Sequence, residues 1–308
     1  MKKTVFIDGA VGTTGLRIHE RLAAREDISL ITLPEEVRKD TAARKEALNA
    51  ADIAFLCLPD AAAIEAVSLI ENDRTAVIDT STAHRTANGW AYGFPELAGR
   101  REEIAVSRRI ANPGCHATGF IALVEPLRQA GVLSREAALS AFSLTGYSGG
   151  GKKMIAEYEA EGRDPLFDAP RQYGIAQTHK HLPEMRVIAD LEKAPVFCPI
   201  VAPFYSGMEV TVPLHACEVK AGVDELNAIY RAYYASGLVR VSEAGDEGGF
   251  LSAAAYSGRD DLAVSVHGNG DRILLVARFD NLGKGASGAA IQNMNILLGV
   301  DEATGLTV

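Results

Sequence analysis

The strongest constraint on the fold is an apolar strand that leads directly into spaced glycines and a helical pattern. Residues 4–8 form the apolar run, Gly9, Gly12 and Gly15 follow it, and apolar residues at helical spacing continue from Leu16. This order is typical of the first segment of a dinucleotide-binding domain. The glycines let the backbone approach a pyrophosphate, and the helix start offers unpaired N–H groups to it. Because the spacing is GxxGxxG rather than GxGxxG, a tight turn without a ligand is the alternative.

Strand and helix patterns continue to alternate as far as about residue 115. Further strands are predicted at residues 28–33, 53–58 and 76–79, with a helix over residues 61–70 and a short apolar segment near residues 104–106. Alternation of this kind predicts an α/β fold with a Rossmann-like, doubly wound parallel sheet.

The second part of the chain has more strands and fewer helices between them. Its turn Gly268-Asn269-Gly270-Asp271 predicts a hairpin, so a second, α+β domain with a mixed or antiparallel sheet is expected. A helix of small residues over positions 285–299 is expected to return to the first domain. The strands of the second domain are predicted at residues 139–144, 196–202, 208–214, 262–266 and 273–279.

Composition excludes several classes of protein. A chain of 308 residues with 47% hydrophobic and 23% charged residues has room for two folded domains. A net charge of −9 without a block of Lys and Arg argues against a nucleic-acid partner, although it permits a local cationic pocket for a small anion. The first apolar run is broken at Asp8, and no stretch approaches the roughly 20 apolar residues that span a bilayer. A cytoplasmic protein without a membrane partner is expected.

Cys115 is the candidate nucleophile. It lies in Asn112-Pro113-Gly114-Cys115-His116-Ala117-Thr118-Gly119, where Pro-Gly ends the preceding segment and residues 120–127 read as a helix. At the start of a helix the macrodipole and the free amides favour a thiolate. The alternative is a buried cysteine with a packing role. That role is expected of the other three cysteines, which lie in or beside apolar runs: Cys57, Cys198 and Cys217.

The segment 177–184 offers a proton carrier for such a thiol. His179, His181 and Glu184 lie close together in it, and a nucleophilic cysteine needs an imidazole base oriented by a neighbouring group. Ordinary histidines at a helix start and a metal site shared with Cys115 are the alternatives, and spacing alone does not bring this segment to Cys115. The remaining candidates, His84, His116, His215 and His267, are expected to make local hydrogen bonds.

A glycine-rich loop offers an anion site. Tyr147-Ser148-Gly149-Gly150-Gly151-Lys152-Lys153 follows a predicted strand, and its successive amides with a lysine can bind a phosphate. It lacks the GxxxxGK[ST] spacing of a nucleoside triphosphate loop, so ATP is not expected. A flexible turn is the alternative.

The identity of the dinucleotide stays open at the level of residues. Glu35 and Glu36 lie about 20 residues beyond the glycines, where an acid that binds the ribose of NAD is expected. Arg38 and Lys39 follow and can pair with the 2′-phosphate of NADP. A solvated, charged turn is the third interpretation.

Taken in order, seven segments resemble the N-acetyl-γ-glutamyl-phosphate reductase family in its shorter variety, over nearly the whole chain. They are the glycine turn and the stretches at residues 79–85, 93–97, 112–115, 148–152, 179–184 and 280–286.

The resemblance implies a fold shared with aspartate-semialdehyde and glyceraldehyde-phosphate dehydrogenases. It implies a dinucleotide-binding domain at residues 1–115, a catalytic and oligomerisation domain at residues 116–283, and a C-terminal helix at residues 284–308 that returns to the first domain. It also implies NADP as cofactor, no metal, and a homodimer or homotetramer. The implied reaction is the third step of arginine biosynthesis, in which NADPH reduces N-acetyl-γ-glutamyl phosphate to the semialdehyde and phosphate.

Site residues follow from the resemblance by position. Cys115 is the nucleophile that forms a thioester, His181 is the preferred acid and base, and His179 is the second choice. Lys152 stands where an arginine is more usual, and lysine makes a point contact instead of a bidentate fork. The implied substrate residues are Asn112, Ser148, Gly149, Lys152 and Glu184, and the implied cofactor residues are Gly9, Gly12, Thr13, Thr14, Gly15, Arg38, Pro59, Ser81, Asn281 and Lys284.

Three other functions are compatible with the same residues. A sister reductase of aspartyl or aminoadipyl phosphate would use the same thiol and the same cofactor. A thiol hydrolase or acyltransferase would use Cys115 without a nicotinamide, and an NADP-sensing protein would not need Cys115 at all.

Overall fold

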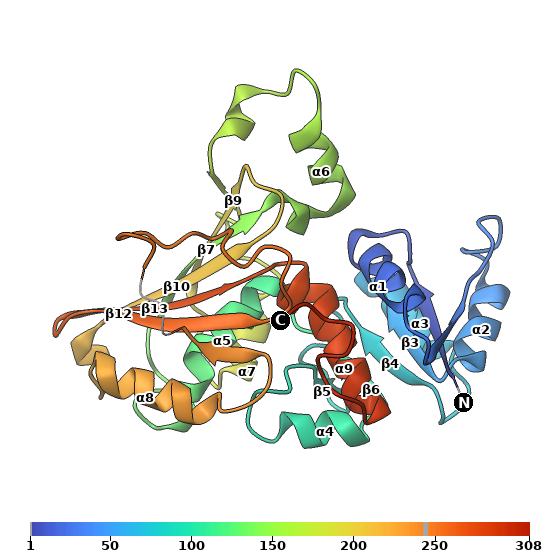
Figure 1. The fold of residues 1–308 in the computed structure, drawn as a ribbon, viewed down its shortest axis with the longest axis horizontal. Coiled ribbons are helices and arrows are strands. Elements are labelled where there is room, and N and C mark those ends of the chain that lie inside the picture. The colour runs from blue at the N-terminus through green and yellow to red at the C-terminus, as the bar shows by residue number, and fades with distance from the viewer. Residues whose placement is uncertain (1, 243–245) are drawn as a thin grey trace. The chain divides into compact units, whose positions relative to one another are not determined.

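The computed structural model describes residues 2–242 and 246–308, and the chain divides into two compact units (Figure 1). Unit 1 takes in the chain as far as Pro113 together with Ala286–Leu306. Unit 2 consists of Gly114–Gly285 with the last two residues, Thr307–Val308. The N-terminal unit is therefore discontinuous in sequence, because its last segment comes after residues Gly114–Gly285 of unit 2.

Unit 1 is built on a six-stranded, entirely parallel sheet with the strand order β2-β1-β3-β4-β6-β5. This confirms the predicted doubly wound α/β architecture. Its strands are β1 (Lys3–Asp8), β2 (Ile28–Ile31), β3 (Ile53–Leu56), β4 (Ala76–Asp79), β5 (Ala91–Tyr92) and β6 (Arg109–Ala111), and its helices are α1 (Thr13–Ala23), α2 (Thr41–Ala50), α3 (Asp60–Ser68), α4 (Arg100–Val106) and α9 (Gly288–Leu298).

Helices cover both faces of this sheet, and each face has its own apolar core. Ile78 of β4 packs in the core that includes α1 and α9, while Val77, its neighbour in the same strand, packs in the core that includes α2 and α3. Burial on both faces explains why the central strands read as continuous apolar runs. Helix α9 contributes Ala290, Ile291 and Met294 to the first core, so the returning segment is part of the unit.

Unit 2 contains a seven-stranded mixed sheet with the order β11-β12-β13-β10-β7-β9-β8, as predicted for the second domain. Strands β12 and β13 pair antiparallel across the predicted hairpin turn, whereas β7 and β9 pair parallel. The strands are β7 (Ser140–Gly146), β8 (Arg171–Gln172), β9 (Val196–Ala202), β10 (Met208–His215), β11 (Val239–Val241), β12 (Leu262–Gly268) and β13 (Arg272–Phe279), and the helices are α5 (Cys115–Gln129), α6 (Gly151–Glu159), α7 (Leu182–Ile188) and α8 (Val223–Tyr233).

Short helices complete the chain between these elements. Three are 3₁₀ turns and the fourth is a π-helix that leads into α9. They are η1 (Tyr147–Gly150), η2 (Pro165–Asp168), η3 (Ala216–Glu218) and η4 (Gly283–Ser287).

Helix α5 packs closely on one face of the sheet of unit 2 and is flanked by α7 and α8 (Figure 1). A Cβ added at Gly119 of this helix would lie 2.5 Å from Cγ2 of Val210 and 2.9 Å from Cε1 of Phe279. A larger residue at position 119 would therefore force the helix away from β10 and β13. This close contact fixes the start of α5, and with it Cys115, relative to the sheet.

The opposite face of the same sheet carries large apolar side chains that are exposed. Phe142 of β7 is 43% exposed, Val196 of β9 is 57% exposed, and Leu274 of β13 is 41% exposed. The strand register places Phe142 and Val196 on one face, because Ser140 pairs with Val196 and Phe142 follows two residues later. A sheet face that is open to water is ordinarily polar.

Candidate active site

Cys115 is the first residue of α5, which confirms that the thiol lies at a helix start. The preceding Gly114 has an extended backbone and no side chain that caps the helix. The first backbone N–H groups of α5 are therefore directed toward the region of the thiol, and the helix dipole favours negative charge there. The helix itself begins five residues before the predicted range of 120–127.

Two neighbours hold the loop that carries the thiol. The backbone N–H of Gly114 donates a hydrogen bond of 2.9 Å to Oε1 of Glu184, whose side chain is buried on α7. On another side Gly285 approaches so closely that a Cβ on it would lie 2.9 Å from Cβ of Cys115. Glu184 thus contacts the backbone next to the nucleophile, a contact that its position in the sequence did not reveal.

The fold brings the segment 179–184 to α5. The rings of His179 and His181 have centroids 4.7 Å apart, and each lies 5.6 Å from the ring of His116, the residue after Cys115. His181 is 5% exposed, and its backbone N–H donates a hydrogen bond of 3.2 Å to Nδ1 of His179. Three imidazoles therefore gather in unit 2 beside the start of α5.

His116 is the residue on which the sequence-based expectation was wrong. It was expected to bond locally, but its Nδ1 lies 2.7 Å from Oγ of Ser143 and its Nε2 lies 2.7 Å from the hydroxyl of Tyr173, which are 27 and 57 residues away. Burial, with a smaller contribution from His179, lowers the pKa of His116 to about 3. His116 is therefore neutral at physiological pH.

Tyr173 was not considered in the sequence-based reasoning. It follows β8, and burial raises the pKa of its hydroxyl, with a further contribution from the nearby Cys115. Nothing in the sequence singles it out, because an aromatic residue after a short strand is most often part of a core. Its position six residues before His179 is the one available signal.

The glycine-rich loop is partly helical. Ser148 lies in η1 and is buried, and its Oγ accepts a hydrogen bond of 3.0 Å from Nδ2 of Asn281. Oδ1 of Asn281 accepts another from the backbone N–H of Gly207 at 2.9 Å. A predicted substrate residue and a predicted cofactor residue are thus directly bonded within unit 2, and Gly149 lies beside the same amide.

The two lysines of the prediction differ in environment. Lys152 is exposed on α6, while Lys284 is almost completely buried in η4. An exposed lysine can reach a bound anion at little desolvation cost, whereas a buried lysine must be compensated by the groups around it.

In unit 1 the predicted cofactor glycines lie in a tight turn between β1 and α1. Gly9 has φ +87°, and a Cβ on it would lie 2.3 Å from the backbone oxygen of Cys57. A Cβ on Gly15 would lie 2.4 Å from the backbone oxygen of Gly9. At Gly12, which precedes α1, an added Cβ would meet no atom closer than 3.5 Å, so this position is open. Thr13 and Thr14 form the first turn of α1.

Arg38, the candidate for a 2′-phosphate, forms an ion pair of 3.1 Å with Glu35. Both side chains are exposed, 37% for Arg38 and 78% for Glu35. Exposed ion pairs of this kind contribute little to the free energy of folding, so Arg38 can leave Glu35 at little cost.

Ser81 is held by a buried carboxylate in unit 1. Its N–H and its hydroxyl donate to Asp79 at 2.9 and 2.7 Å, and Nδ1 of His84 lies 2.6 Å from the same carboxylate. The ring of His84 stacks on Trp90 with centroids 4.0 Å apart. Among the other predicted residues, Pro59 precedes the first residue of α3 and is exposed.

Asn112, a predicted substrate residue, lies in unit 1 and holds the returning segment. Its Nδ2 donates a hydrogen bond of 3.0 Å to the backbone oxygen of Ala286, and its own backbone oxygen accepts one of 3.0 Å from Nε of Arg85. Asn293 of α9 donates to its side-chain oxygen at 3.3 Å. These contacts give Asn112 a structural role in unit 1.

Other kinds of site find no support in the described part of the chain. In residues 2–242 and 246–308, no group of three or more His, Cys, Asp or Glu residues is arranged to hold a metal ion. Within the same ranges, no helix has the length and apolar character needed to cross a membrane.

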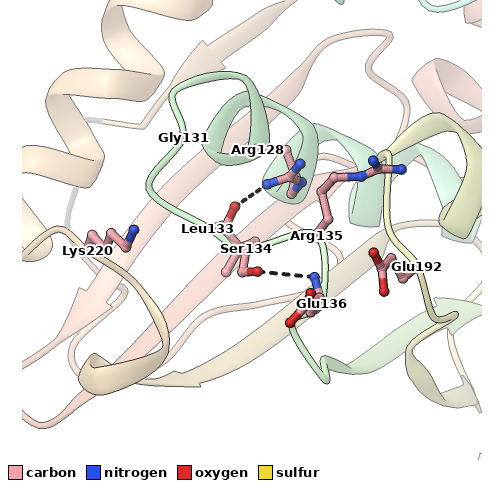
Figure 2. A pocket seen from close by; sticks show the side chains of 8 residues that line it. All are labelled: Arg128, Gly131, Leu133, Ser134, Arg135, Glu136, Glu192 and Lys220. Atoms are coloured by element: carbon pink, nitrogen blue, oxygen red, sulfur yellow. Dashed lines mark hydrogen bonds between the residues drawn. The ribbon is translucent and has the colours of Figure 1, made fainter.

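A cavity of about 370 Å³ lies at the C-terminal end of α5, and Figure 2 shows its side chains. Within this lining, Nη1 of Arg128 donates a hydrogen bond to the backbone oxygen of Leu133. None of the predicted site residues lines this cavity, so it is separate from the thiol and the imidazoles. Its lining consists of Arg128, Gly131, Leu133, Ser134, Arg135, Glu136, Glu192 and Lys220.

The fold and the site define a semialdehyde dehydrogenase. One unit has a parallel sheet of the dinucleotide-binding type, and the other has a thiol at a helix start with imidazoles beside it. The sequence profile "Semialdehyde dehydrogenase, NAD binding domain" matches residues 34–107, and "Semialdehyde dehydrogenase, dimerisation domain" matches residues 115–281. In fold, the chain is similar to aspartate semialdehyde dehydrogenase II of Vibrio cholerae in complex with ASA, with a TM-score of 0.74, 18% identity, and 97% of this chain and 99% of that chain covered. It is also similar to aspartate semialdehyde dehydrogenase of Candida albicans with NADP. For that structure the TM-score is 0.69 and the sequence identity is 16%, with 97% of this chain and 99% of that chain covered.

Sequence similarity defines the family more narrowly. The N-acetyl-gamma-glutamyl-phosphate reductase of Burkholderia ambifaria is 46% identical over 310 residues, which cover 97% of each chain. This chain belongs to the N-acetyl-γ-glutamyl-phosphate reductase family.

Proposed function

We propose that the protein catalyses the reversible, NADPH-dependent reduction of N-acetyl-γ-glutamyl phosphate to N-acetylglutamate 5-semialdehyde and phosphate, a step of arginine biosynthesis. One observation carries the proposal: Cys115 opens α5, and three imidazoles lie beside that helix start. An acyl phosphate needs a nucleophile of this kind, because a thiolate displaces phosphate and leaves a thioester.

The protein residues divide the work as follows. The Cys115 thiolate attacks the acyl carbon, and the amides at the start of α5 stabilise the oxyanion as phosphate leaves. NADPH, when bound, supplies the hydride that reduces the thioester carbonyl. An imidazole first takes the proton of the thiol, and later gives a proton to the oxygen of the thiohemiacetal. When the thiohemiacetal collapses, its hydroxyl returns this proton to the imidazole, the C–S bond breaks, and the aldehyde and the thiolate are released.

We propose His181 as this acid and base, in preference to His179. Nδ1 of His179 accepts the backbone N–H of His181, so neutral His179 carries its hydrogen on Nε2. That nitrogen can donate a hydrogen bond but cannot accept the thiol proton. His116 is excluded as a base near neutral pH, because its pKa is about 3.

Substrate recognition is proposed at the end of β7. Ser148, Gly149 and the exposed Lys152 offer a hydroxyl, backbone amides and a mobile positive charge for the phosphate. Glu184 and Asn112 remain proposed substrate residues, but the contacts with Gly114 and Ala286 favour roles in holding the backbone around them.

NADP is the proposed dinucleotide. The open backbone at Gly12 and the uncapped start of α1 fit a pyrophosphate, and Thr13 and Thr14 lie in the same first turn. Arg38 supports NADP over NAD, since its exposed pair with Glu35 can be exchanged for a 2′-phosphate. Pro59, Ser81, Asn281 and Lys284 are proposed to serve the nicotinamide half.

We propose a homodimer or a homotetramer that forms through the open face of the sheet in unit 2. The dimerisation profile covers this sheet, and Phe142, Val196 and Leu274 give it an apolar surface. The four free thiols, with a nucleophile among them, suit a reducing compartment, and we propose the cytoplasm. No metal is needed for this chemistry.

The test is the reverse reaction, with NADP, phosphate and one semialdehyde at a time. N-acetylglutamate semialdehyde should be oxidised, and Cys115→Ser should abolish turnover while NADPH binding, followed by fluorescence titration, stays close to that of the wild type. Activity with aspartate or aminoadipate semialdehyde alone would assign the protein to a sister reductase. Failure to bind any nicotinamide would favour a thiol hydrolase.

A further inference from the structure

We propose that Ser143, His116 and Tyr173 form a directed hydrogen-bond relay that presents the Tyr173 hydroxyl as a donor to the negative charge developed at Cys115. The inference rests on the proposed function for the identity of that charge, the thiolate and then the oxyanion of the acyl group. The Tyr173 hydroxyl would be a side-chain donor in addition to the backbone N–H groups at the start of α5.

The direction of the relay follows from Ser143. This residue is completely buried on β7, and among the described residues its hydroxyl has His116 Nδ1 as its one partner. A buried hydroxyl whose hydrogen has no acceptor destabilises the fold, so the Ser143 hydroxyl donates to Nδ1 of His116. An imidazole that accepts at Nδ1 and is neutral carries its hydrogen on Nε2.

The second step passes from His116 to Tyr173. Nε2 of His116 lies 2.7 Å from the Tyr173 hydroxyl, so the Nε2–H group donates to the phenolic oxygen. The hydrogen of the hydroxyl is then directed away from His116. Tyr173 is thus bonded to the residue that directly follows Cys115 at the start of α5. Burial raises the pKa of Tyr173, and a charge at Cys115 raises it further, so the hydroxyl stays protonated and is available as a donor.

The relay depends on His116 remaining neutral. A protonated imidazole would donate at both nitrogens and would turn Ser143 into an acceptor. Burial keeps the pKa of His116 at about 3. The ring of Phe197 lies 5.3 Å from its ring between centroids, and the rings of His179 and His181 each lie 5.6 Å away. Ser143, Tyr173, His179 and His181 are the polar groups whose contacts with it the hydrogen bonds and ring geometry define.

This arrangement separates two tasks among the histidines. His181 is proposed to move protons, whereas His116 and Ser143 are positioning residues that act through Tyr173. A hydroxyl donor strengthens as charge develops on the sulfur or on the acyl oxygen, which is the condition for an effect on the rate.

The experiment measures the thiol itself, without substrate. Alkylation of Cys115 by iodoacetamide is followed against pH by mass spectrometry of its peptide, in the wild type, Tyr173→Phe, His116→Leu and the double variant. Tyr173→Phe and His116→Leu should each shift the midpoint of alkylation upward, by on the order of one pH unit, because the thiolate loses a donor. The double variant should shift no further than Tyr173→Phe alone.

Two further variants separate positioning from folding. His116→Gln retains an N–H group near the position of Nε2 and should restore most of the wild-type midpoint. Tyr233→Phe is the matched control, because it removes a tyrosine hydroxyl that donates to Glu125 on the same helix α5. It should leave the midpoint unchanged.

Turnover provides the second readout. In the reductase assay kcat should fall roughly ten- to a hundredfold in Tyr173→Phe, with a smaller change in KM. An unchanged alkylation midpoint in Tyr173→Phe, or additive shifts in the double variant, would overturn the relay. If the midpoint shifts but no acyl-phosphate reduction is detected with the wild type, the relay stands and the proposed function fails.

Discussion

At the scale of single residues, His116 illustrates how burial decides what a histidine can do. It follows the nucleophile directly in the chain, yet its low pKa removes it from proton transfer near neutral pH. Proton transfer is therefore left to its neighbours in the cluster, of which His181 is the proposed acid and base. Sequence alone could not separate these roles, because the difference arises from desolvation by residues 27 to 81 positions away.

The low pKa of His116 predicts a specific pH dependence of stability. An ordinary histidine has a pKa of 6.5, so between about pH 6.5 and pH 3 the unfolded chain binds the proton and the folded chain does not. The stability that depends on neutral His116 is complete above pH 6.5 and is lost as the pH falls toward 3. His116→Gln, which does not titrate, should flatten the free energy of unfolding in this window by up to about 1.4 kcal/mol per pH unit.

Urea unfolding followed by circular dichroism at several pH values measures this slope. The wild type is the reference, because the wild type and His116→Gln have the same carboxylates, and their titration in this pH range contributes equally to both slopes. Equal slopes in the wild type and in His116→Gln would contradict a neutral, buried His116.

At the scale of elements, the glycine turn before α1 allows stability and binding to be separated. Gly15→Ala places a methyl group 2.4 Å from the backbone oxygen of Gly9 and should destabilise unit 1 by about 1–3 kcal/mol. The methyl group of Gly12→Ala would meet no atom closer than 3.5 Å, so the free energy of unfolding should change by less than about 1 kcal/mol. Affinity for NADPH should fall tenfold or more, because the methyl group keeps the pyrophosphate away from the backbone.

Trp90 makes the stability measurement specific, because the chain has one tryptophan and it lies in unit 1. Its fluorescence on heating reports on that unit, and a titration with NADPH reports on binding. Wild-type affinity in Gly12→Ala would place the pyrophosphate elsewhere.

The elements also show which parts of the fold a sequence predicts. Strands buried on both faces or alternating clearly were predicted closely, and β4 and β9 agree at both ends. Helix α2 was missed because its ten residues are mostly alanine and charged side chains, with no long apolar stripe. Cys115 was identified by its local turn residues. Its contacts with Glu184 and Gly285 join residues far apart in sequence, which no local pattern specifies.

At the scale of the whole molecule, the open face of the sheet in unit 2 predicts self-association. Phe142→Lys would place a charge in the apolar interface and should shift the protein toward monomers by tenfold or more in dissociation constant, measured by sedimentation at several concentrations. Val106→Lys is the control, because Val106 is 83% exposed on α4 of unit 1. An unchanged molar mass in Phe142→Lys would exclude this face as the interface.

The order of segments in unit 1 also bears on how the protein is made. A ribosome synthesises all six strands of the parallel sheet before residue 113, but α9 and the apolar side chains that it adds to their core emerge only after Gly114–Gly285 of unit 2. The first unit therefore stays incomplete, with one face of its sheet lacking α9, throughout synthesis of the intervening 172 residues of Gly114–Gly285. During that interval the growing chain carries an apolar surface that α9 later covers.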